Sequence, residues 1–218
     1  GIFGGSLYFF TENTALGITQ ASNVSFIICT APLLTTILSL LFYKSEKASK
    51  GLIYGSLLAL MGVGLIVFNG SFVLKISPIG DLLTLLAALS WAFYSLIIKK
   101  MAGRYPTIFI TRKIFFYGVL TILPAFLLHP LHPDTVVLLQ PAVLFNLLFL
   151  AVLASLICYV LWNVVLKQLG TVRASNYIYL NPLVTMIASF LILDEKITLV
   201  ALGGAACIVC GVYWAEKK

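Results

Sequence analysis

The sequence carries one acidic residue well inside an apolar segment, Glu12 in the stretch YFFTENTALG. A charge at the centre of a bilayer-spanning helix costs roughly 2.5–3.5 kcal/mol on translocon scales, so such a residue either reaches water near a helix end or serves a function. A half-buried carboxylate suits a proton relay or the binding of a cationic group. Glu12 is therefore the first candidate for substrate or proton binding, and an interfacial cap is the alternative interpretation.

Aromatic and amide side chains form a second group of candidates, because in combination they suit the wall of a small-molecule cavity. Trp91 and Tyr94 are three residues apart and can share one helix face. Each aromatic residue taken alone is more often a lipid-facing or core residue, so the inference depends on the whole set. The candidates for substrate or proton binding are Glu12, Asn13, Trp91, Tyr94, Trp162, Asn163, Tyr177 and Asn181.

Pro32 and Pro182 lie near the middle of two apolar segments. A proline lacks the backbone N–H and clashes with the carbonyl four residues back. In lipid that carbonyl must find another partner or face a polar cavity. We expect both prolines to form a hinge or a bent cavity wall, with a simple packing kink as the alternative.

Other chemistry is poorly supported. Cys207 and Cys210 form a C-x-x-C pair, but their surroundings are apolar and further ligands are lacking, so we expect packing residues. His129 and His132 stand in the loop HPLHPD, for which a solvated loop is a better interpretation than a metal site. The sequence has neither a P-loop nor clustered catalytic residues, so we expect no enzyme, no metal site and no cofactor.

The composition requires a membrane environment for these residues. The chain of 218 residues is 61% hydrophobic and 10% charged, whereas soluble domains are near 45–50% apolar and about 25% charged. Most of its eight apolar stretches approach the roughly 20 residues that a helix needs to cross a bilayer. They cover approximately residues 1–17, 22–43, 51–70, 79–98, 108–128, 142–166, 174–193 and 198–215. The sequence thus predicts an all-α polytopic membrane protein with eight transmembrane helices.

The net charge of +7 is distributed unevenly across the predicted topology. If the spans cross the membrane alternately, one side holds twelve Lys and Arg residues and the other holds only Lys75 and Lys196. The positive-inside rule assigns the rich side, and with it the C-terminus, to the cytoplasm. The positive charge therefore reflects topology, and nucleic acid is not an expected partner.

An internal repeat relates two parts of the chain about 150 residues apart. APLLTTILSLL and NPLVTMIASFL align, and Glu46, Gly55 and Gly62 match Glu195, Gly204 and Gly211 after a shift of one residue. Ten identical pairs align at 150: Asn13/Asn163, Leu16/Leu166, Ser25/Ser175, Ile28/Ile178, Pro32/Pro182, Leu33/Leu183, Thr35/Thr185, Ile37/Ile187, Ser39/Ser189 and Leu41/Leu191.

The repeat predicts an architecture. Because the second span and its copy are five spans apart, the two copies have opposite orientations, as in secondary transporters that work by alternating access. Residues 77–218 then form a complete five-helix unit, whereas residues 1–76 hold the last three helices of the first unit. Glycines on the last helix of each unit predict close helix packing, with a homodimer interface as the alternative.

Four segments carry a family resemblance. ALGITQASNVSFIICTAPLLTTILSLLF and GDLLTLLAALSWAFYSLIIKK resemble the EamA-type transporters of the drug/metabolite transporter (DMT) superfamily. NPLVTMIASFLILDEKIT, followed by GGAACIVCGV, is similar to the end of the same repeat unit. The resemblance covers nearly the whole chain.

The resemblance implies a ten-helix transporter made of two inverted five-helix EamA repeats around a central cavity, of which this chain holds eight helices. It implies a permease or exporter of small metabolites. The aromatic candidates would suit amino acids or flat drugs as substrates, and Glu12 makes protons a candidate coupling ion. The aromatic and amide candidates stand at positions where the family lines its cavity. A bacterial plasma membrane is the expected location. A non-transport membrane enzyme or an assembly subunit is the alternative, although an inverted repeat has no obvious use in either.

Overall fold

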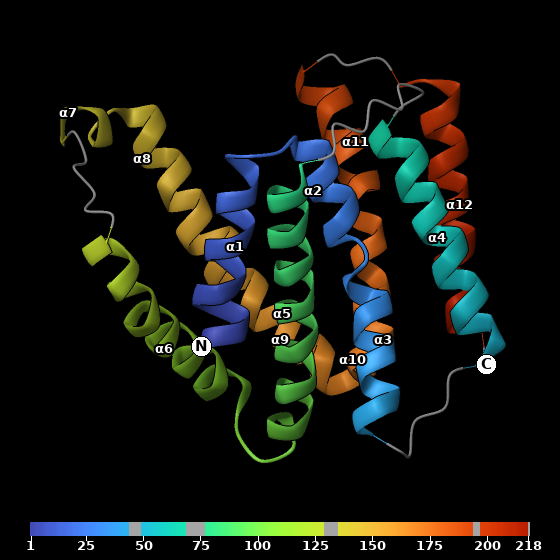
Figure 1. Ribbon diagram of the computed structural model, residues 1–218, viewed down its shortest axis with the longest axis horizontal. Helices are drawn as coiled ribbons and strands as arrows, with labels where there is room; N and C mark the ends of the chain where they lie inside the picture. Colours follow the sequence, from blue (N-terminus) through green and yellow to red (C-terminus); the bar gives the residue numbers. More distant parts are fainter. Residues whose placement is uncertain (44–48, 69–76, 129–134, 194–196, 218) are drawn as a thin grey trace.

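The computed structural model describes residues 1–43, 49–68, 77–128, 135–193 and 197–217, whose regular secondary structure is helical. Figure 1 shows the longer helices standing side by side as a bundle. The elements are η1 (Ile2–Ser6), α1 (Leu7–Leu16), α2 (Ala21–Ile28), α3 (Ala31–Phe42), α4 (Lys50–Phe68), α5 (Pro78–Ala102), α6 (Thr107–Leu128), α7 (Thr135–Leu138), α8 (Pro141–Leu148), η2 (Phe149–Ile157), α9 (Cys158–Leu169), α10 (Thr171–Asn176), η3 (Tyr177–Leu180), α11 (Asn181–Leu193) and α12 (Leu199–Glu216).

Seven helical segments among the described residues are long and apolar enough to cross a membrane. They are Ala21–Phe42, Lys50–Phe68, Pro78–Ala102, Thr107–Ala125, Pro141–Leu169, Thr171–Ile192 and Leu199–Glu216. The first predicted span corresponds to η1 and α1, which together extend only from Ile2 to Leu16. At 1.5 Å per residue this segment is roughly 22 Å long, shorter than a typical hydrocarbon core. The chain is an all-α membrane protein with seven or eight transmembrane segments.

Two of these segments are interrupted just before a proline. The helix ends at Ile28 and resumes at Ala31, so that Pro32 occupies the first turn of α3. In the corresponding later segment, Thr171–Ile192, the helix changes to the 3₁₀ turn η3 before α11 begins at Asn181. Pro182 is the second residue of α11. The first helical turn tolerates proline because its N–H would lack an intrahelical partner anyway. The side chain of Thr30 closes the break in the first case, since its hydroxyl donates a 2.6 Å hydrogen bond to the carbonyl of Ile27.

The element boundaries follow the sequence repeat. The first residues of α2 and α3, 21 and 31, reappear 150 positions later as those of α10 and α11, 171 and 181. Helix α4 begins at 50, and α12 begins 149 positions later at 199. The wide π-type turns η1 and η2 also fall at corresponding places. Local structure therefore repeats along the chain together with the sequence.

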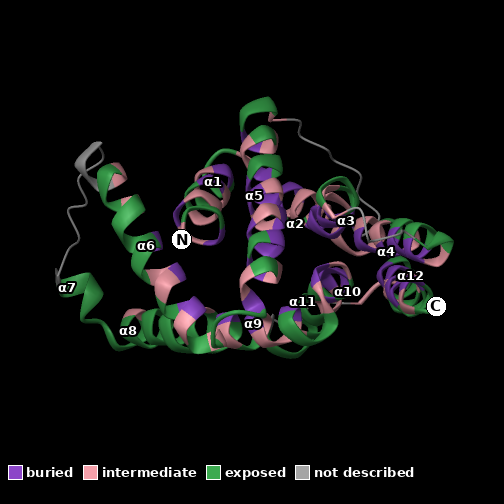
Figure 2. Cartoon of the chain, turned by 90° about the horizontal axis from the view of Figure 1, so that it is seen from below, coloured by how far each residue is buried: buried purple, intermediate pink, exposed green. Residues whose placement is uncertain are grey.

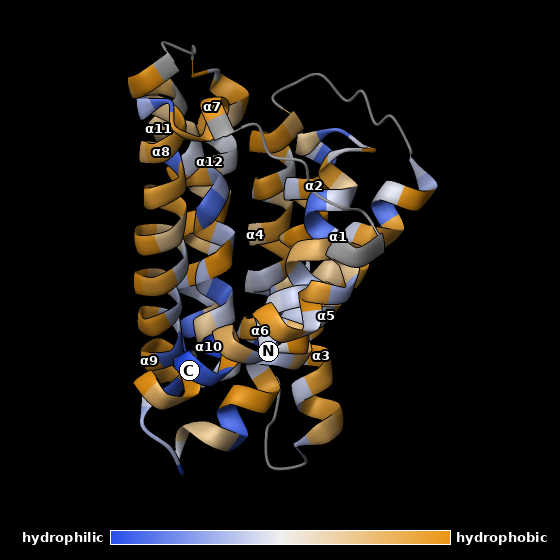
Figure 3. Ribbon diagram, turned by 90° about the vertical axis from the view of Figure 1, so that its left-hand side faces the viewer, coloured by the Kyte–Doolittle hydropathy of each residue, from blue (hydrophilic) through white to orange (hydrophobic). Residues whose placement is uncertain are grey.

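Helix α5 lies in the middle of the bundle, where it packs against α1, α2 and α3. Small residues such as Ala87, Ala88 and Ala92 are fully buried on it and allow this close approach. By contrast, α8 and η2 are exposed along their length, as the green ribbon in Figure 2 shows. Hydrophobic residues dominate the column formed by α8 and α9 in Figure 3. Such a surface suits contact with lipid tails.

Helices α4 and α12 form an antiparallel pair with the most extensive packing among the described elements. Four glycines bring their backbones together. A Cβ atom on Gly204 would lie 2.7 Å from the carbonyl oxygen of Gly62, and one on Gly211 would lie 2.6 Å from that of Gly55. Larger residues do not fit at these positions without a shift of backbone. Gly55, Gly62, Gly204 and Gly211 therefore pack closely within one chain, whereas a Cβ atom on Gly203 would meet nothing within 4 Å.

Candidate functional site

A cavity of about 700 Å³ lies between α1 and α2 on one side and α11 on the other. The end of α4 and the start of α12 complete its wall through Ile66, Val67 and Ala201. Its polar lining comes from Tyr8, Glu12, Ser22, Ser25, Asn181 and Thr185. The cavity therefore brings residues of the first repeat copy opposite residues of the second.

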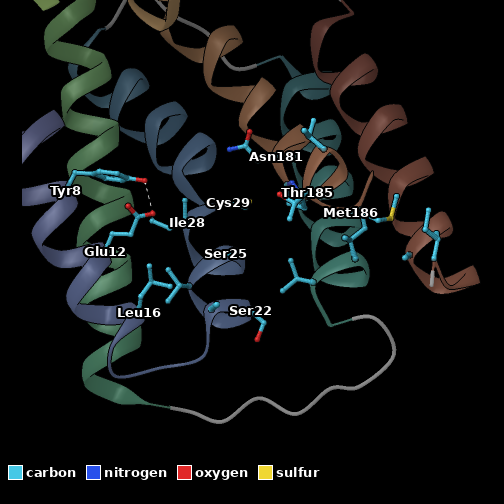
Figure 4. A pocket seen from close by; sticks show the side chains of 18 residues that line it. Tyr8, Glu12, Leu16, Ser22, Ser25, Ile28, Cys29, Asn181, Thr185 and Met186 are labelled. Carbon is cyan, nitrogen blue, oxygen red and sulfur yellow. Dashed lines mark hydrogen bonds between the residues drawn. The ribbon is translucent and has the colours of Figure 1, made fainter. Parts of the chain in front are cut away.

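Glu12 is the acidic residue in this lining. Its side chain is partly buried, and Oε1 accepts a 3.0 Å hydrogen bond from the hydroxyl of Tyr8 (Figure 4). The two residues are four apart on α1 and so lie on the same helix face. The hydrogen bond uses one carboxylate oxygen and orients the group at the edge of the cavity. This arrangement can hold a cationic group or a proton.

The ring of Tyr8 connects Glu12 to a buried aromatic cluster centred on Trp91. The centroid of Trp91 lies 5.0 Å from that of Tyr8, 5.2 Å from Tyr94, 5.7 Å from Trp162 and 5.9 Å from Tyr159. The rings come from α1, α5 and α9, so packing of the helices is needed to assemble them. The buried indole N–H groups of Trp91 and Trp162 lack hydrogen-bond partners among the described residues.

A chain of hydrogen bonds fixes the far side of this cluster. The hydroxyl of Tyr94 donates to Oδ1 of Asn163 over 2.8 Å, and Nδ2 of Asn163 donates to the hydroxyl of Thr111 over 2.9 Å. The hydroxyl of Tyr159 donates to the carbonyl of Gly4 over 2.6 Å. Gly4 packs so close to the ring of Tyr94 that a Cβ would overlap it. Because these groups are satisfied within the bundle, they act as supports for the cluster rather than as free ligands.

The predicted site residues fall into three groups. Glu12 and Asn181 line the cavity, as does Pro182. Trp91, Tyr94, Trp162 and Asn163 form the cluster behind Tyr8, and Pro32 is buried away from the cavity wall.

Asn13 and Tyr177 form the third group, which belongs neither to the cavity lining nor to the aromatic cluster. Asn13 is exposed, and its side chain donates to the carbonyl of Phe9 over 2.7 Å. Tyr177 is 38% exposed and lies beside Glu216 at the end of α12. The geometry thus separates these two residues from the cavity.

The candidates from sequence omitted several residues of the site. Tyr8 stands four residues before Glu12, and this spacing is a usable signal for a pair on one helix face. Ser25 and Thr185 belong to the aligned repeat, although their identity alone did not indicate a cavity. Nothing in the sequence indicated that Tyr159 belongs to the site, because its position depends on how α9 packs against α5.

The described residues hold no group of three or more His, Cys, Asp and Glu side chains that could bind a metal ion. His129 and His132 lie outside the described residues. The four cysteines are free thiols.

Comparison with known proteins assigns the chain to a family. The profile of the EamA-like transporter family matches residues 1–68 and 78–215. The chain belongs to this family. As an EamA-like protein of the DMT superfamily it is a transporter and not an enzyme, which confirms the resemblance inferred from sequence and removes the alternative of a membrane enzyme.

Individual relatives of this EamA-like chain agree with the assignment. An uncharacterized transporter of Archaeoglobus fulgidus is 30% identical over 99% of the chain and 73% of the relative. A probable amino-acid metabolite efflux pump of Salmonella typhimurium is 29% identical over 79% of the chain and 60% of the relative. A solved crystal structure with 19% identity superposes with a TM-score of 0.81 over 99% of the chain and 73% of that protein, a likeness of fold.

Proposed function

We propose that this EamA-like protein is a secondary transporter that exports small amino-acid-like metabolites by alternating access and exchanges them for protons. The position of Glu12 in the cavity wall, with its carboxylate held by Tyr8, is the observation that carries the proposal. A partly buried carboxylate can bind either a proton or the cationic amino group of a substrate, so the two compete for one site. Such competition couples proton entry to substrate release.

Alternating access requires two halves that move against each other. The 150-residue repeat, the matching element boundaries and the antiparallel pairing of α4 with α12 support two inverted units. Residues 1–76 then supply the last three helices of the first EamA unit, and residues 77–218 supply all five helices of the second. The complete transporter in this proposal has ten helices.

The substrate class follows from the chemistry of the cavity. Glu12 offers a site for an amino group, and Ser25, Asn181 and Thr185 offer hydrogen-bonding groups for a small polar solute. The name of the Salmonella typhimurium relative, a probable amino-acid metabolite efflux pump, favours the same class. The distribution of basic residues supports an orientation in a bacterial plasma membrane with the C-terminus in the cytoplasm.

Purified full-length protein in liposomes tests this proposal. A panel of amino acids, their acylated derivatives and cationic drugs would be screened for ligand-induced thermal stabilisation, and each hit would then be measured for proton-driven flux. We expect flux of at least one zwitterionic metabolite that depends on the proton gradient. Stabilisation and flux confined to solutes that lack a cationic amino group would contradict the proposal.

A further inference from the structure

Helix α6 carries two adjacent basic residues inside a candidate membrane-spanning segment. Arg112 and Lys113 follow Thr107, the first residue of α6, by five and six positions, which is roughly 8–9 Å along the helix axis. The headgroup layer on each side of a bilayer is only about 5–8 Å thick. Both residues therefore belong to the level at which lipid headgroups give way to acyl chains.

Arg112 lies on the exposed face of α6. Ile108 and Phe116, four residues to either side of it, are 73% and 59% exposed, and Arg112 itself is exposed. The opposite face, with the buried residues Ile110 and Ile114, is directed into the bundle, where α6 packs mainly against η1. Figure 2 shows α6 at the edge of the bundle far from the C-terminus. The face of Arg112 suits contact with acyl chains, among which an uncompensated charge is costly.

Aromatic rings surround the two charges. Nζ of Lys113 lies 5.8 Å from each of three ring centroids, those of Phe109, Phe116 and Tyr117. The first ring belongs to the preceding helical turn and the other two to the following turn, so the ammonium group stays level with its own turn. Cζ of Arg112 lies 5.5 Å from the centroid of Phe109. Such cation–π contacts offset part of the cost of desolvation, but they leave the positive charge in place.

The surrounding elements provide no counter-charge for this pair. Among the described elements that pack most closely against α6, η1 and α9 contain no Asp or Glu. Helix α5 has only Asp81, in its first turn, at the opposite end from the connection to α6. Residues 82–133 contain no acidic residue and five basic ones, namely Lys99, Lys100, Arg104, Arg112 and Lys113. An anion from outside the bundle is therefore the fitting partner.

We propose that Phe109, Arg112, Lys113, Phe116 and Tyr117 form a binding site for the headgroup phosphate of an anionic phospholipid, which we name the α6 lipid site. The positive-inside rule places it at the cytoplasmic leaflet, whose anionic lipids attract basic residues near the surface. The guanidinium of Arg112 offers paired donors to phosphate oxygens, and the ammonium of Lys113 offers a compact charge. The positive end of the helix dipole at the start of α6 acts in the same direction.

The position of the site favours a lipid over a free phosphate ion. A free ion would have to leave water to reach the level of Lys113, whereas a lipid phosphate already lies near this level. The exposed apolar face of α6 then receives the acyl chains of the same lipid. The α6 lipid site shares no residue with the cavity lining, so this inference does not rest on the proposed transport function.

Lipid titration of the wild-type protein gives the first test. Purified full-length protein is delipidated in a neutral detergent and mixed with phosphatidylglycerol, with phosphatidylcholine of the same acyl chains, or with inorganic phosphate. Native mass spectrometry measures bound lipid, and thermal unfolding measures stabilisation. We expect phosphatidylglycerol alone to bind tightly and to raise the unfolding midpoint. Equal effects of the two lipids would overturn the proposal, and equal stabilisation by inorganic phosphate would show a site for free anions only.

Two double variants with the same loss of charge give the second test. Arg112→Gln/Lys113→Gln should weaken binding of phosphatidylglycerol by about thirtyfold, since each basic residue near an anionic membrane contributes a factor of about five. Lys50→Gln/Lys217→Gln removes two exposed charges next to the α4–α12 pair, at the other edge of the bundle, and should bind like the wild type. Equal affinities of the two double variants would show that the lipid responds only to net charge, and the α6 lipid site would be wrong.

The charge-conserving variant Arg112→Lys/Lys113→Arg should retain the preference for phosphatidylglycerol over phosphatidylcholine. If Arg112→Gln/Lys113→Gln does not fold, the single variants Arg112→Gln and Lys113→Gln provide the same readout, with an expected loss of about fivefold each. Wild-type affinity in both single variants would overturn the proposal. Flux of metabolites is not needed for any of these measurements, so failure of the transport proposal would leave their outcome unchanged.

Discussion

The hydroxyl of Tyr8 donates a 3.0 Å hydrogen bond to Oε1 of Glu12, one helical turn further along α1. This pair joins the cavity to the aromatic cluster, because the ring of Tyr8 also packs on Trp91 with centroids 5.0 Å apart. A change in the charge of Glu12 therefore affects both a ligand in the cavity and the aromatic rings that hold α1 against α5.

Glu12→Gln should abolish proton-driven transport and flatten its dependence on pH, because the amide has the size of the carboxylic acid but cannot ionise. Flux in liposomes across pH 5 to 9 measures the effect. Glu216→Gln, which removes a carboxylate at the end of α12 outside the cavity lining, is the charge-matched control. Wild-type flux at every pH from Glu12→Gln would show that the carboxylate is only an interfacial cap.

Tyr8→Phe should keep the ring contact with Trp91 and lose the hydrogen bond to Glu12. Hydrogen bonds to charged groups contribute about 1.5–3 kcal/mol, so we expect the apparent affinity for substrate to fall by roughly tenfold or more. The maximal rate and the folded yield should change little. Competition binding and flux measured at several substrate concentrations separate these effects, and an unchanged affinity would contradict a role for the pair.

Pro32→Ala and Pro182→Ala should each reduce transport while leaving expression and thermal stability close to those of the wild type. Both prolines follow a helix interruption, and alanine lets the helix continue through it, which stiffens the segment. Flux per folded molecule is the measurement. If folded protein and activity decline in parallel for both variants, packing alone accounts for the prolines.

Gly204→Ala should destabilise the protein, because its Cβ would lie 2.7 Å from the carbonyl oxygen of Gly62. Overpacking of this kind costs about 1–3 kcal/mol, or roughly 2–10 °C in the midpoint of thermal unfolding. The adjacent Gly203→Ala is a matched control, since its Cβ would meet nothing within 4 Å. Thermal unfolding in detergent distinguishes the two, and equal midpoints would contradict the close contact of α4 with α12.

The orientation predicts that Gln140→Cys reacts with an impermeant thiol reagent from the outer side and Ser49→Cys from the cytoplasmic side. Gln140 directly precedes α8 on the outer side of the predicted topology, and Ser49 directly precedes α4 on the basic side. A background without the native cysteines is needed because Cys158 and Cys210 are exposed. Reversed labelling would overturn the assignment of the two membrane faces.

Much of the helical frame could be predicted from sequence, because long apolar segments in a membrane protein have few alternatives to helix. Seven of the eight predicted spans agree with candidate membrane-spanning helices. The first predicted span, approximately residues 1–17, is also helical from Ile2 to Leu16, but these 15 residues are fewer than the roughly 20 that a helix needs to cross a bilayer. The breaks before Pro32 and Pro182 follow from local chemistry and were expected as bends.

The site was less predictable, because its contacts join residues far apart in the chain. Sequence periodicity places Trp91 and Tyr94 on one face, but it cannot show that Tyr94 meets Asn163, 69 residues later. The candidate Tyr177 proved to be 38% exposed, whereas Tyr179, two residues later, is fully buried, because the two residues lie on different sides of the 3₁₀ turn η3. To predict the cavity wall, one would have to know which of two aligned residues lines the cavity. Residues that are identical in both repeat copies do not carry this information.

The contact between α4 and α12 has a consequence for biosynthesis. Gly62 and Gly204 touch across 142 residues of chain, so α4 leaves the ribosome long before its partner exists. At about 5–20 residues per second, the interval is roughly 7–28 s. During that time the flat glycine face of α4 is open to lipid or to other nascent helices. Assembly of the α4–α12 pair is complete only when α12 has been inserted, and loss of α12 would therefore leave the glycine face of α4 uncovered.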